Sequence, residues 1–179
     1  MKTGLVLEGG AFRTIFSCGV CDAFLDAGLP LPDYTVGVSA GIAYGVSYLS
    51  RQNRRNLKLL TTYANDKRYM GVGNFLDRRN RSYFGLKYEH FLLLQATCAI
   101  PLMFPVIHLD GQPYLDGGCA DAIPWRHALE AGCDRVVVIL TRERSYSKGP
   151  SSVQQRLLAR RFRRYPKFVE TMARRAEAY

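Results

Sequence analysis

The segment 37–41, with the sequence Gly-Val-Ser-Ala-Gly, constrains this chain more than any other feature. It matches the pattern G-x-S-x-G and stands between a β-rich run, 34–38, and a stretch of small and apolar residues that predicts a buried helix, 39–49. A sharp strand-to-helix turn of this kind exposes the hydroxyl of Ser39, and the flanking glycines relieve crowding. The helix N-terminus behind the serine favours negative charge in front of it. The alternative interpretation is a glycine-rich turn that serves packing alone.

A serine nucleophile needs a base, and the three histidines lack the expected setting. In serine hydrolases with this turn and a histidine base, the histidine comes last, in a loop after a late strand. His108 falls in a predicted strand, His127 falls in a predicted short helix over 124–131, and His90 lies in a poorly defined region. The sequence therefore favours packing or surface roles for all three.

A carboxylate is the better candidate for the base. Asp116 ends a predicted strand and is followed by Gly117 and Gly118, so another backbone segment can approach it closely. Partial burial beside apolar walls would raise the pKa of its carboxyl above the usual value of about 3.9. A carboxylate with a raised pKa is a stronger general base. Seen alone, the same residues also fit a plain Asp-Gly turn.

A third element opens the first predicted helix. Residues 8–13, Glu-Gly-Gly-Ala-Phe-Arg, follow a short apolar run that predicts a buried strand, 3–7. Free backbone N–H groups at this point can stabilise an oxyanion, and Arg13 adds positive charge. The dinucleotide-binding pattern G-x-G-x-x-G would need glycine where Ala11 and Thr14 stand, so we do not expect dinucleotide binding.

Taken in order over residues 3–141, these elements resemble the patatin-like phospholipase family. The segments 96–101 (Ala-Thr-Cys-Ala-Ile-Pro) and 114–118 (Tyr-Leu-Asp-Gly-Gly) are similar to that family's approach to its aspartate. The alternation of strands and helices predicts an α/β fold. The resemblance implies a three-layer sandwich with a mostly parallel central sheet and helices on both faces. It also implies lipid acyl-ester hydrolysis of the phospholipase A, lysophospholipase or esterase type, through an acyl-enzyme, with no metal and no cofactor.

The resemblance also implies a role for each residue that matches the family's motifs. Ser39 is implied to be the nucleophile and Asp116 the base, which agrees with a site that lacks histidine. The residues that the resemblance implies around the oxyanion are Gly9, Gly10, Ala11, Arg13 and Ala40. The motif glycines that it implies are Gly37, Gly41, Gly117 and Gly118.

The sequence departs from the family pattern in two ways. Ala11 and Thr14 stand where members usually have glycine, and alanine narrows the allowed backbone angles, so we expect weakened oxyanion stabilisation. Ser39 and Asp116 are 77 positions apart, whereas members usually place well over a hundred residues there. The composition changes abruptly near residues 86–91, and we hypothesise that a segment is absent at that point.

The charge of the chain, formally +10, is concentrated in two segments. Residues 51–87 carry ten basic and two acidic side chains, and residues 142–179 carry eleven and three. Such segments fit peripheral association with an anionic membrane, or simply two solvated faces. Linker-like composition over 145–152 divides a hydrolase domain, 1–144, from a basic extension, 145–179, in which Pro166 separates two helices.

Other features indicate the compartment and further elements. No apolar run is long enough to span a bilayer, and the N-terminus has no secretory core, so we expect a cytoplasmic protein, peripheral to the inner membrane face. The five cysteines predict reduced thiols, and Cys18 and Cys21 predict helix packing rather than half of a zinc site. Residues 106–115 predict a hairpin around Asp-Gly, and the apolar run over 135–141 predicts a central strand buried on both faces.

Two other functions stay open on the sequence alone. The first is a catalytically weak or inactive binding protein on a hydrolase-like fold, which Ala11, Thr14 and the short middle of the chain favour. The second is nucleic-acid binding through residues 160–165, where basic and aromatic side chains alternate. Because no nucleic-acid-binding module is recognisable, nucleic acid is not the expected partner. The sequence does not indicate an oligomeric state.

Overall fold

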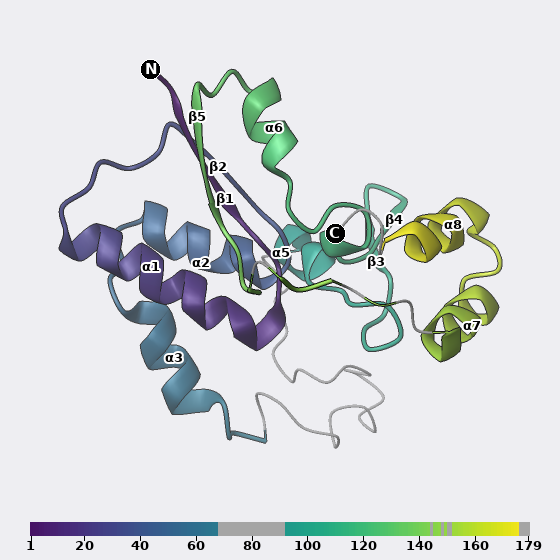
Figure 1. The fold of residues 1–179 in the computed structure, drawn as a ribbon. Helices are drawn as coiled ribbons and strands as arrows, with labels where there is room; N and C mark the ends of the chain where they lie inside the picture. Colours follow the sequence, from purple (N-terminus) through teal and green to yellow (C-terminus); the bar gives the residue numbers. More distant parts are fainter. Residues whose placement is uncertain (68–91, 144, 148, 150–151, 176–179) are drawn as a thin grey trace.

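The computed structural model describes residues 1–67, 92–143, 145–147, 149 and 152–175 of the chain. Within them, β1 (Thr3–Leu7), β2 (Tyr34–Gly37) and β5 (Arg135–Ile139) form a parallel sheet in the order β2-β1-β5 (Figure 1). Leu7 pairs with Gly37 on one side and with Ile139 on the other, so the three strands end at the same level. The segment near residues 86–91 lies outside the described residues.

Helices cover both faces of this sheet (Figure 1). Leu5 and Leu7 of β1 point to one face, where they pack with side chains of α1 (Ile15–Asp26) and α2 (Ala40–Leu49). Val6 points to the other face and packs near α6 (Trp125–Glu130). The alternation follows from the two-residue period of a strand. The predicted α/β arrangement with helices on both faces is therefore confirmed.

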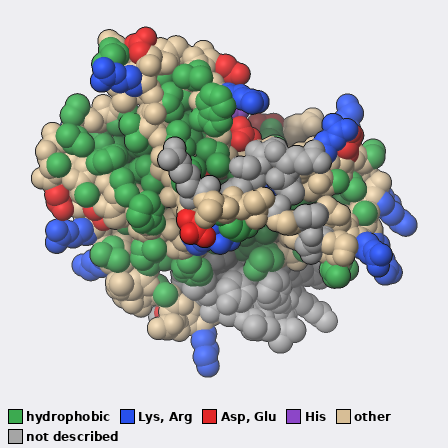
Figure 2. Space-filling view, in the orientation of Figure 1, with side chains coloured by type: hydrophobic (Ala, Val, Ile, Leu, Met, Phe, Trp, Pro, Cys, Tyr) green, Lys and Arg blue, Asp and Glu red, His purple; other side chains and the backbone are tan. Residues whose placement is uncertain are grey.

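The position of β5 corrects one expectation from the sequence. Residues 135–141 were expected to form a central strand buried on both faces, yet within the described sheet β5 lies at an edge and β1 lies in the centre. Val137 is 43% exposed and Val138 is 38% exposed. An apolar run predicts a strand, but it carries no information on which strands flank it. Figure 2 shows hydrophobic side chains over the side of the molecule that carries β5 and α1.

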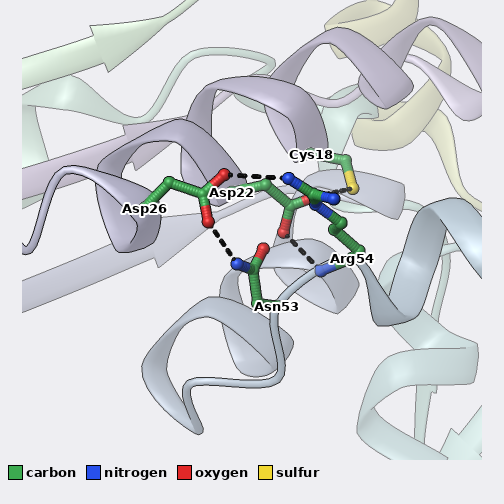
Figure 3. Close-up of polar contacts among 5 residues, drawn as sticks. All are labelled: Cys18, Asp22, Asp26, Asn53 and Arg54. Carbon is green, nitrogen blue, oxygen red and sulfur yellow. Dashed lines mark hydrogen bonds and ion pairs between the residues drawn. The ribbon is translucent and has the colours of Figure 1, made fainter.

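Two aspartates of α1 hold the turn that leads into α3 (Arg55–Tyr63), as Figure 3 shows. The backbone N–H of Arg54 donates to Asp22 Oδ1 at 2.9 Å, and its guanidinium lies 3.4 Å from Asp26 Oδ2. Asn53 Nδ2 donates to Asp26 Oδ1 at 2.5 Å. Arg54 has a left-handed φ of 57°, and these bonds stabilise that turn.

The two cysteines of α1 behave as packing residues. Cys18 and Cys21 are both buried, and Cys21 belongs to the core beneath the sheet. Burial raises the pKa of the Cys18 thiol to about 11 and that of the Cys21 thiol to about 12, so both are protonated at neutral pH. In the described ranges, no group of His, Cys, Asp and Glu side chains is arranged to hold a metal ion.

A short helix and the predicted hairpin follow. The helix is α5 (Leu92–Thr97), and the hairpin pairs β3 (Ile107–Leu109) with β4 (Gln112–Tyr114) in antiparallel register. Asp110 and Gly111 form its turn with φ angles of 48° and 75°. Two successive positive φ values are what an Asp-Gly hairpin turn requires. The hairpin expected from the sequence is therefore confirmed.

The C-terminal segment folds back on the segment that carries Asp116. It forms α7 (Ser152–Arg161) and α8 (Pro166–Arg174), with Pro166 beginning the second helix as expected. Their apolar side chains pack around Cys119, three residues after Asp116. The buried and partly buried members of this cluster are Leu158, Phe162, Met172, Val106, Leu115, Phe168 and Val169. None of the helices in the described part of the chain is long and apolar enough to cross a membrane.

Candidate active site

The carboxyl ends of the three parallel strands meet at a pocket of about 250 Å³. Residues that directly follow β1 and β2, and Arg142 after β5, all line it. Ligands of open parallel sheets bind at this edge, because the loops that leave the strands converge there. Seven of the site residues predicted from the sequence line the pocket: Gly9, Gly10, Ala11, Arg13, Ser39, Asp116 and Gly118.

Ser39 occupies a strained turn between β2 and α2. Its φ and ψ angles are 54° and −133°, a conformation that residues other than glycine rarely adopt. Both flanking glycines are required by close backbone contacts. A Cβ added to Gly37 would lie 2.8 Å from the backbone nitrogen of Ile42, and one added to Gly41 would lie 2.7 Å from the carbonyl oxygen of Glu8. The G-x-S-x-G spacing therefore lets the turn fit against the end of β1.

Asp116 lies beside Ser39 although 77 residues separate them. The Ser39 hydroxyl lies close enough to the Asp116 carboxylate to lower the pKa of that carboxyl. Asp116 caps the 3-10 turn Gly117–Cys119, and its Oδ1 accepts a hydrogen bond of 2.8 Å from the backbone N–H of Gly118. The glycines after the aspartate thus have a specific use, because a backbone donor orients the carboxylate toward the serine.

The Asp116 carboxyl is 8% exposed, and burial raises its pKa above the ordinary value of 3.8. The hydrogen bonds from Ser39 and Gly118 and the positive charge of Arg175 lower the pKa and offset part of that rise. The balance leaves a carboxylate that is a better proton acceptor than an exposed aspartate. This environment matches the one expected from the sequence.

The loop after β1 is fixed to the end of β5. Glu8 is fully buried, and its Oε2 accepts a hydrogen bond from the backbone N–H of Thr141. The Thr141 hydroxyl lies 3.5 Å from the carbonyl oxygen of Gly9, and a Cβ added to Gly10 would lie 2.8 Å from that hydroxyl. Among the described residues, no hydrogen bond leaves the backbone N–H groups of Gly10 and Ala11. These two donors at the pocket wall are available to an oxyanion.

The two departures from glycine in this loop have different structural effects. Ala11 adopts a φ of 48°, in the left-handed region that favours glycine, so alanine is strained there. Thr14 is fully buried, and its hydroxyl donates to the carbonyl oxygen of Ala11 at 2.5 Å. Thr14 therefore stabilises the 3-10 turn Ala11–Thr14 that precedes α1.

Cys98 lies beside Ser39 and Asp116, and both residues act on the pKa of its thiol. Burial, and then the neighbouring charge of Asp116, raise the pKa of the Cys98 thiol to about 11. Because the thiolate is the nucleophilic form, this thiol is a weak nucleophile at neutral pH.

Other predicted residues lie away from the pocket. Ala40 begins α2 directly after Ser39 and is not among the described residues that line the pocket, so a role for its N–H group stays a prediction. His108 and His127 are exposed on β3 and α6, and His127 contacts Glu130 at 3.1 Å. His90 lies outside the described residues. The pair of Ser39 and Asp116 thus has no histidine from the described chain beside it.

Three pocket residues were not singled out from the sequence. Arg142 and Tyr146 follow β5, and the Arg142 guanidinium lies 4.2 Å from the centre of the Tyr146 ring. Arg175 follows α8 and reaches the pocket from the C-terminal segment. No local pattern distinguishes Arg175, because it is one of eleven basic residues among residues 142–179. Only the packing of α8 brings it to Asp116.

Comparisons with known proteins agree with this site. The chain is similar to the uncharacterized protein YjjU of Escherichia coli (strain K12), with 27% identity over 185 residues that take in 78% of this chain and 52% of the relative. The chain therefore spans about half the length of the curated relative it matches. The matched stretch is longer than this whole chain of 179 residues, so the relative has residues within it that this chain lacks.

The sequence model of the patatin-like phospholipase family matches residues 5–95. This range is half of the chain and includes the loop after β1, Ser39 and its flanking glycines. Asp116 lies beyond the matched range, but the fold brings it to the same pocket. Together with the parallel sheet and its helical layers, the match shows that the chain belongs to the patatin-like phospholipase family.

Proposed function

We propose that this chain is a serine acyl hydrolase that cleaves carboxylic esters of acyl chains, with Ser39 as nucleophile and Asp116 as base. Members of the patatin-like phospholipase family hydrolyse ester bonds in general, and the proposal narrows this to phospholipase A, lysophospholipase or esterase chemistry. The observation that carries the proposal is that Ser39 and the buried Asp116 line the same pocket and the Ser39 hydroxyl acts on the pKa of the Asp116 carboxyl.

The proposed reaction has two steps. In the first, the Ser39 oxygen attacks the ester carbonyl while its proton passes to Asp116, and the bond to the alcohol breaks as that proton moves to the leaving oxygen. In the second, Asp116 takes a proton from water, and the hydroxide attacks the acyl-enzyme to release the fatty acid and restore Ser39. A carboxylate with a raised pKa fits both roles, because it must accept and then return a proton.

The negative charge on the carbonyl oxygen would be stabilised by the loop after β1. The proposed donors are the backbone N–H groups of Gly10 and Ala11, with Ala40 after the nucleophile, and Arg13 adds positive charge nearby. Gly9 allows the loop to lie against the nucleophile turn, since an added Cβ would lie 3.2 Å from the Cβ of Ser39. This proposal needs no metal ion and no cofactor for any step.

The direct test is release of fatty acid from a panel of monoacyl and diacyl lipids and short-chain aryl esters. We expect the wild-type chain to hydrolyse at least one class, and Ser39→Ala and Asp116→Asn to lose that activity. Ser50→Ala is a matched control, because Ser50 is an exposed serine at the end of α2. Hydrolysis that survives in Ser39→Ala would contradict the proposal.

A second candidate function is a weakly active or inactive protein that binds anionic membrane surfaces. Two observations favour it: the strained Ala11 in the oxyanion loop and an open groove of about 850 Å³ on the C-terminal segment. Four arginines and three apolar or aromatic side chains line the groove: Arg160, Arg161, Arg163, Arg164, Leu102, Leu157 and Tyr165. Lys and Arg side chains project from this side of the molecule in Figure 2.

Membrane association would follow from charge together with apolar contact. Each basic side chain near an anionic surface is worth about 1 kcal/mol at low salt, and the attraction is screened by salt. We expect the chain to sediment with vesicles that contain phosphatidylserine and to be released by added salt. Equal binding to neutral and anionic vesicles would contradict this function. In this proposal, residues 1–144 form the hydrolase domain and residues 145–179 form the extension that faces the membrane. The protein lies in the cytoplasm, at the inner face of the membrane. Nucleic acid is not a partner in this proposal.

A further inference from the structure

The pocket beside Ser39 and Asp116 carries more positive charge than acyl transfer requires. Arg13, Arg142 and Arg175 all line it. Its two carboxylates are engaged by the chain, because Glu8 accepts from the backbone of Thr141 and Asp116 accepts from the backbone of Gly118. The polar part of the pocket therefore presents cations to whatever enters it.

Arg175 is held in the pocket by the packing of α8. Met172, three residues earlier, is buried against Cys119, and Phe168 and Val169 pack in the same cluster. A Cβ added to Gly118 would lie 3.5 Å from Nη2 of Arg175, so the guanidinium runs along the loop that orients Asp116. The C-terminal segment thus completes one wall of the catalytic pocket.

Within the described part of the chain, the guanidinium of Arg175 has one buried donor that is not satisfied. Its Nε is buried and has no hydrogen-bond partner within the described part of the chain. In those same residues, no carboxylate lies within ion-pair distance of Arg175, although its charge acts on Asp116. A buried donor without an acceptor is costly and is normally satisfied by protein, water or ligand.

The guanidinium of Arg142 also has donors that can bind an anion. Its guanidinium stacks on the ring of Tyr146, with 4.2 Å between the carbon of the guanidinium and the ring centre. Stacking leaves the N–H groups in the plane of the guanidinium, where they can bind two oxygens of a phosphate or carboxylate. The pocket, about 250 Å³, is smaller than most small-molecule sites, which measure on the order of 300–1,000 Å³, so it suits a compact polar group.

We propose that Arg142 and Arg175 form an anion subsite in the catalytic pocket, and that this chain prefers acyl esters whose alcohol carries a phosphate group. The effect of this subsite on hydrolysis rests on the proposed function, whereas anion binding at the subsite does not. The phosphate binds the two guanidinium groups and places the scissile ester at Ser39, while the apolar chain extends out of the pocket. A neutral acylglycerol offers no anion to either guanidinium group and therefore gains less from them.

The test compares two substrates that differ only in the phosphate: a monoacylglycerol and the monoacylglycerol 3-phosphate with the same acyl chain. We expect kcat/KM to be at least about tenfold higher for the phosphate ester, mainly through KM. In Arg175→Gln and in Arg142→Gln we expect this preference to fall by about tenfold. Arg174→Gln is the matched control, because Arg174 ends α8 in an exposed ion pair with Glu170. Its preference stays as in the wild type.

A binding measurement separates the subsite from the chemistry. We expect Ser39→Ala to bind the monoacylglycerol phosphate in calorimetry at least about tenfold more tightly than the neutral lipid, and Ser39→Ala with Arg175→Gln to lose this difference. Arg175→Lys keeps the charge and restores part of the preference, and thermal unfolding checks that each variant is folded. If neither lipid is hydrolysed, the proposed function fails while calorimetry still decides on the subsite. Equal affinity for both lipids, or an unchanged preference in Arg175→Gln, would overturn it.

Discussion

The hydroxyl oxygen of Thr97 accepts a hydrogen bond of 3.1 Å from the backbone N–H of Ser39, across 58 residues of sequence. Two residues further on, the carbonyl oxygen of Ala99 accepts a hydrogen bond of 3.0 Å from the backbone N–H of Asp116. The end of α5 and the residues directly after it therefore hold the backbone of both members of the pair. These two backbone hydrogen bonds help to fix the separation between Ser39 and Asp116.

This arrangement makes Thr97 a positioning residue. Thr97→Val keeps the shape of the side chain but removes the acceptor, so the strained turn at Ser39 loses a restraint. We expect kcat to fall by about tenfold to a hundredfold with little change in KM, because small misplacements of a nucleophile are costly. Thr97→Ser retains the hydroxyl and restores most of the activity. Equal losses in both variants would contradict the positioning role.

We expect Asp116→Asn to lower activity without lowering the stability of the fold at pH 7. The amide keeps an oxygen for the Gly118 N–H but cannot accept the serine proton, and we expect activity to fall by about 10²–10⁴-fold. Burial raises the pKa of Asp116 in the folded state, so folding binds protons and the contribution of this group to stability declines as pH rises through the raised pKa. Above that pH, Asp116→Asn removes a buried charge. We expect its melting temperature at pH 7 to equal or exceed that of the wild type, and a clear decrease would contradict the account.

The pH dependence of hydrolysis reports the same carboxyl. Since Asp116 must be ionised to accept a proton, the acid limb of kcat/KM should lie at higher pH than the ordinary aspartate value of 3.8. Arg175 lowers the pKa of Asp116, so Arg175→Gln should move the acid limb to still higher pH. Arg174→Gln should leave it in place. The other titratable or charged groups near this carboxyl are Glu8, Arg13, Cys98, Arg142 and Tyr146.

The strain at Ala11 predicts a stabilising substitution. Glycine adopts a φ of 48° without a steric penalty, whereas the left-handed region costs an alanine about 1–2 kcal/mol. Because glycine also gains freedom in the unfolded chain, we expect Ala11→Gly to change the unfolding free energy by roughly 0 to +1 kcal/mol. Ala23→Gly, at an exposed position inside α1, should instead lower it by roughly 0.5–1 kcal/mol. Similar losses in both variants, measured by urea unfolding, would contradict the strain.

The sequence predicted the parts of this fold that local chemistry determines. The three parallel strands, the hairpin turn at Asp110 and Gly111 and the break at Pro166 all follow from patterns within a few residues. The predicted central position of β5 was wrong, because sheet order depends on which segments pair in space.

The candidate site also has one part that local motifs predict and another part that they do not. Ser39, Asp116 and the loop at Gly9 and Gly10 carry recognisable local motifs, and the pocket includes them all. Thr97 lies within the segment 96–101, which the sequence analysis singled out. Its hydrogen bond to the backbone of Ser39, 58 residues away, could not be predicted from any local pattern. Arg175 depends on the packing of α8 against Cys119, so the sequence could not have distinguished it from its basic neighbours.

The central claim is that Ser39 is an activated nucleophile, and its most direct test is intact-mass spectrometry after treatment with a fluorophosphonate probe. We predict a single adduct on the wild-type chain and none on folded Ser39→Ala, while Ser50→Ala, altered at an exposed serine after α2, keeps the adduct. Asp116→Asn should react with the probe much more slowly, since the side chain beside the Ser39 hydroxyl is then no longer a base. A folded wild-type chain that takes up no probe, or an adduct that persists in Ser39→Ala, would contradict the claim.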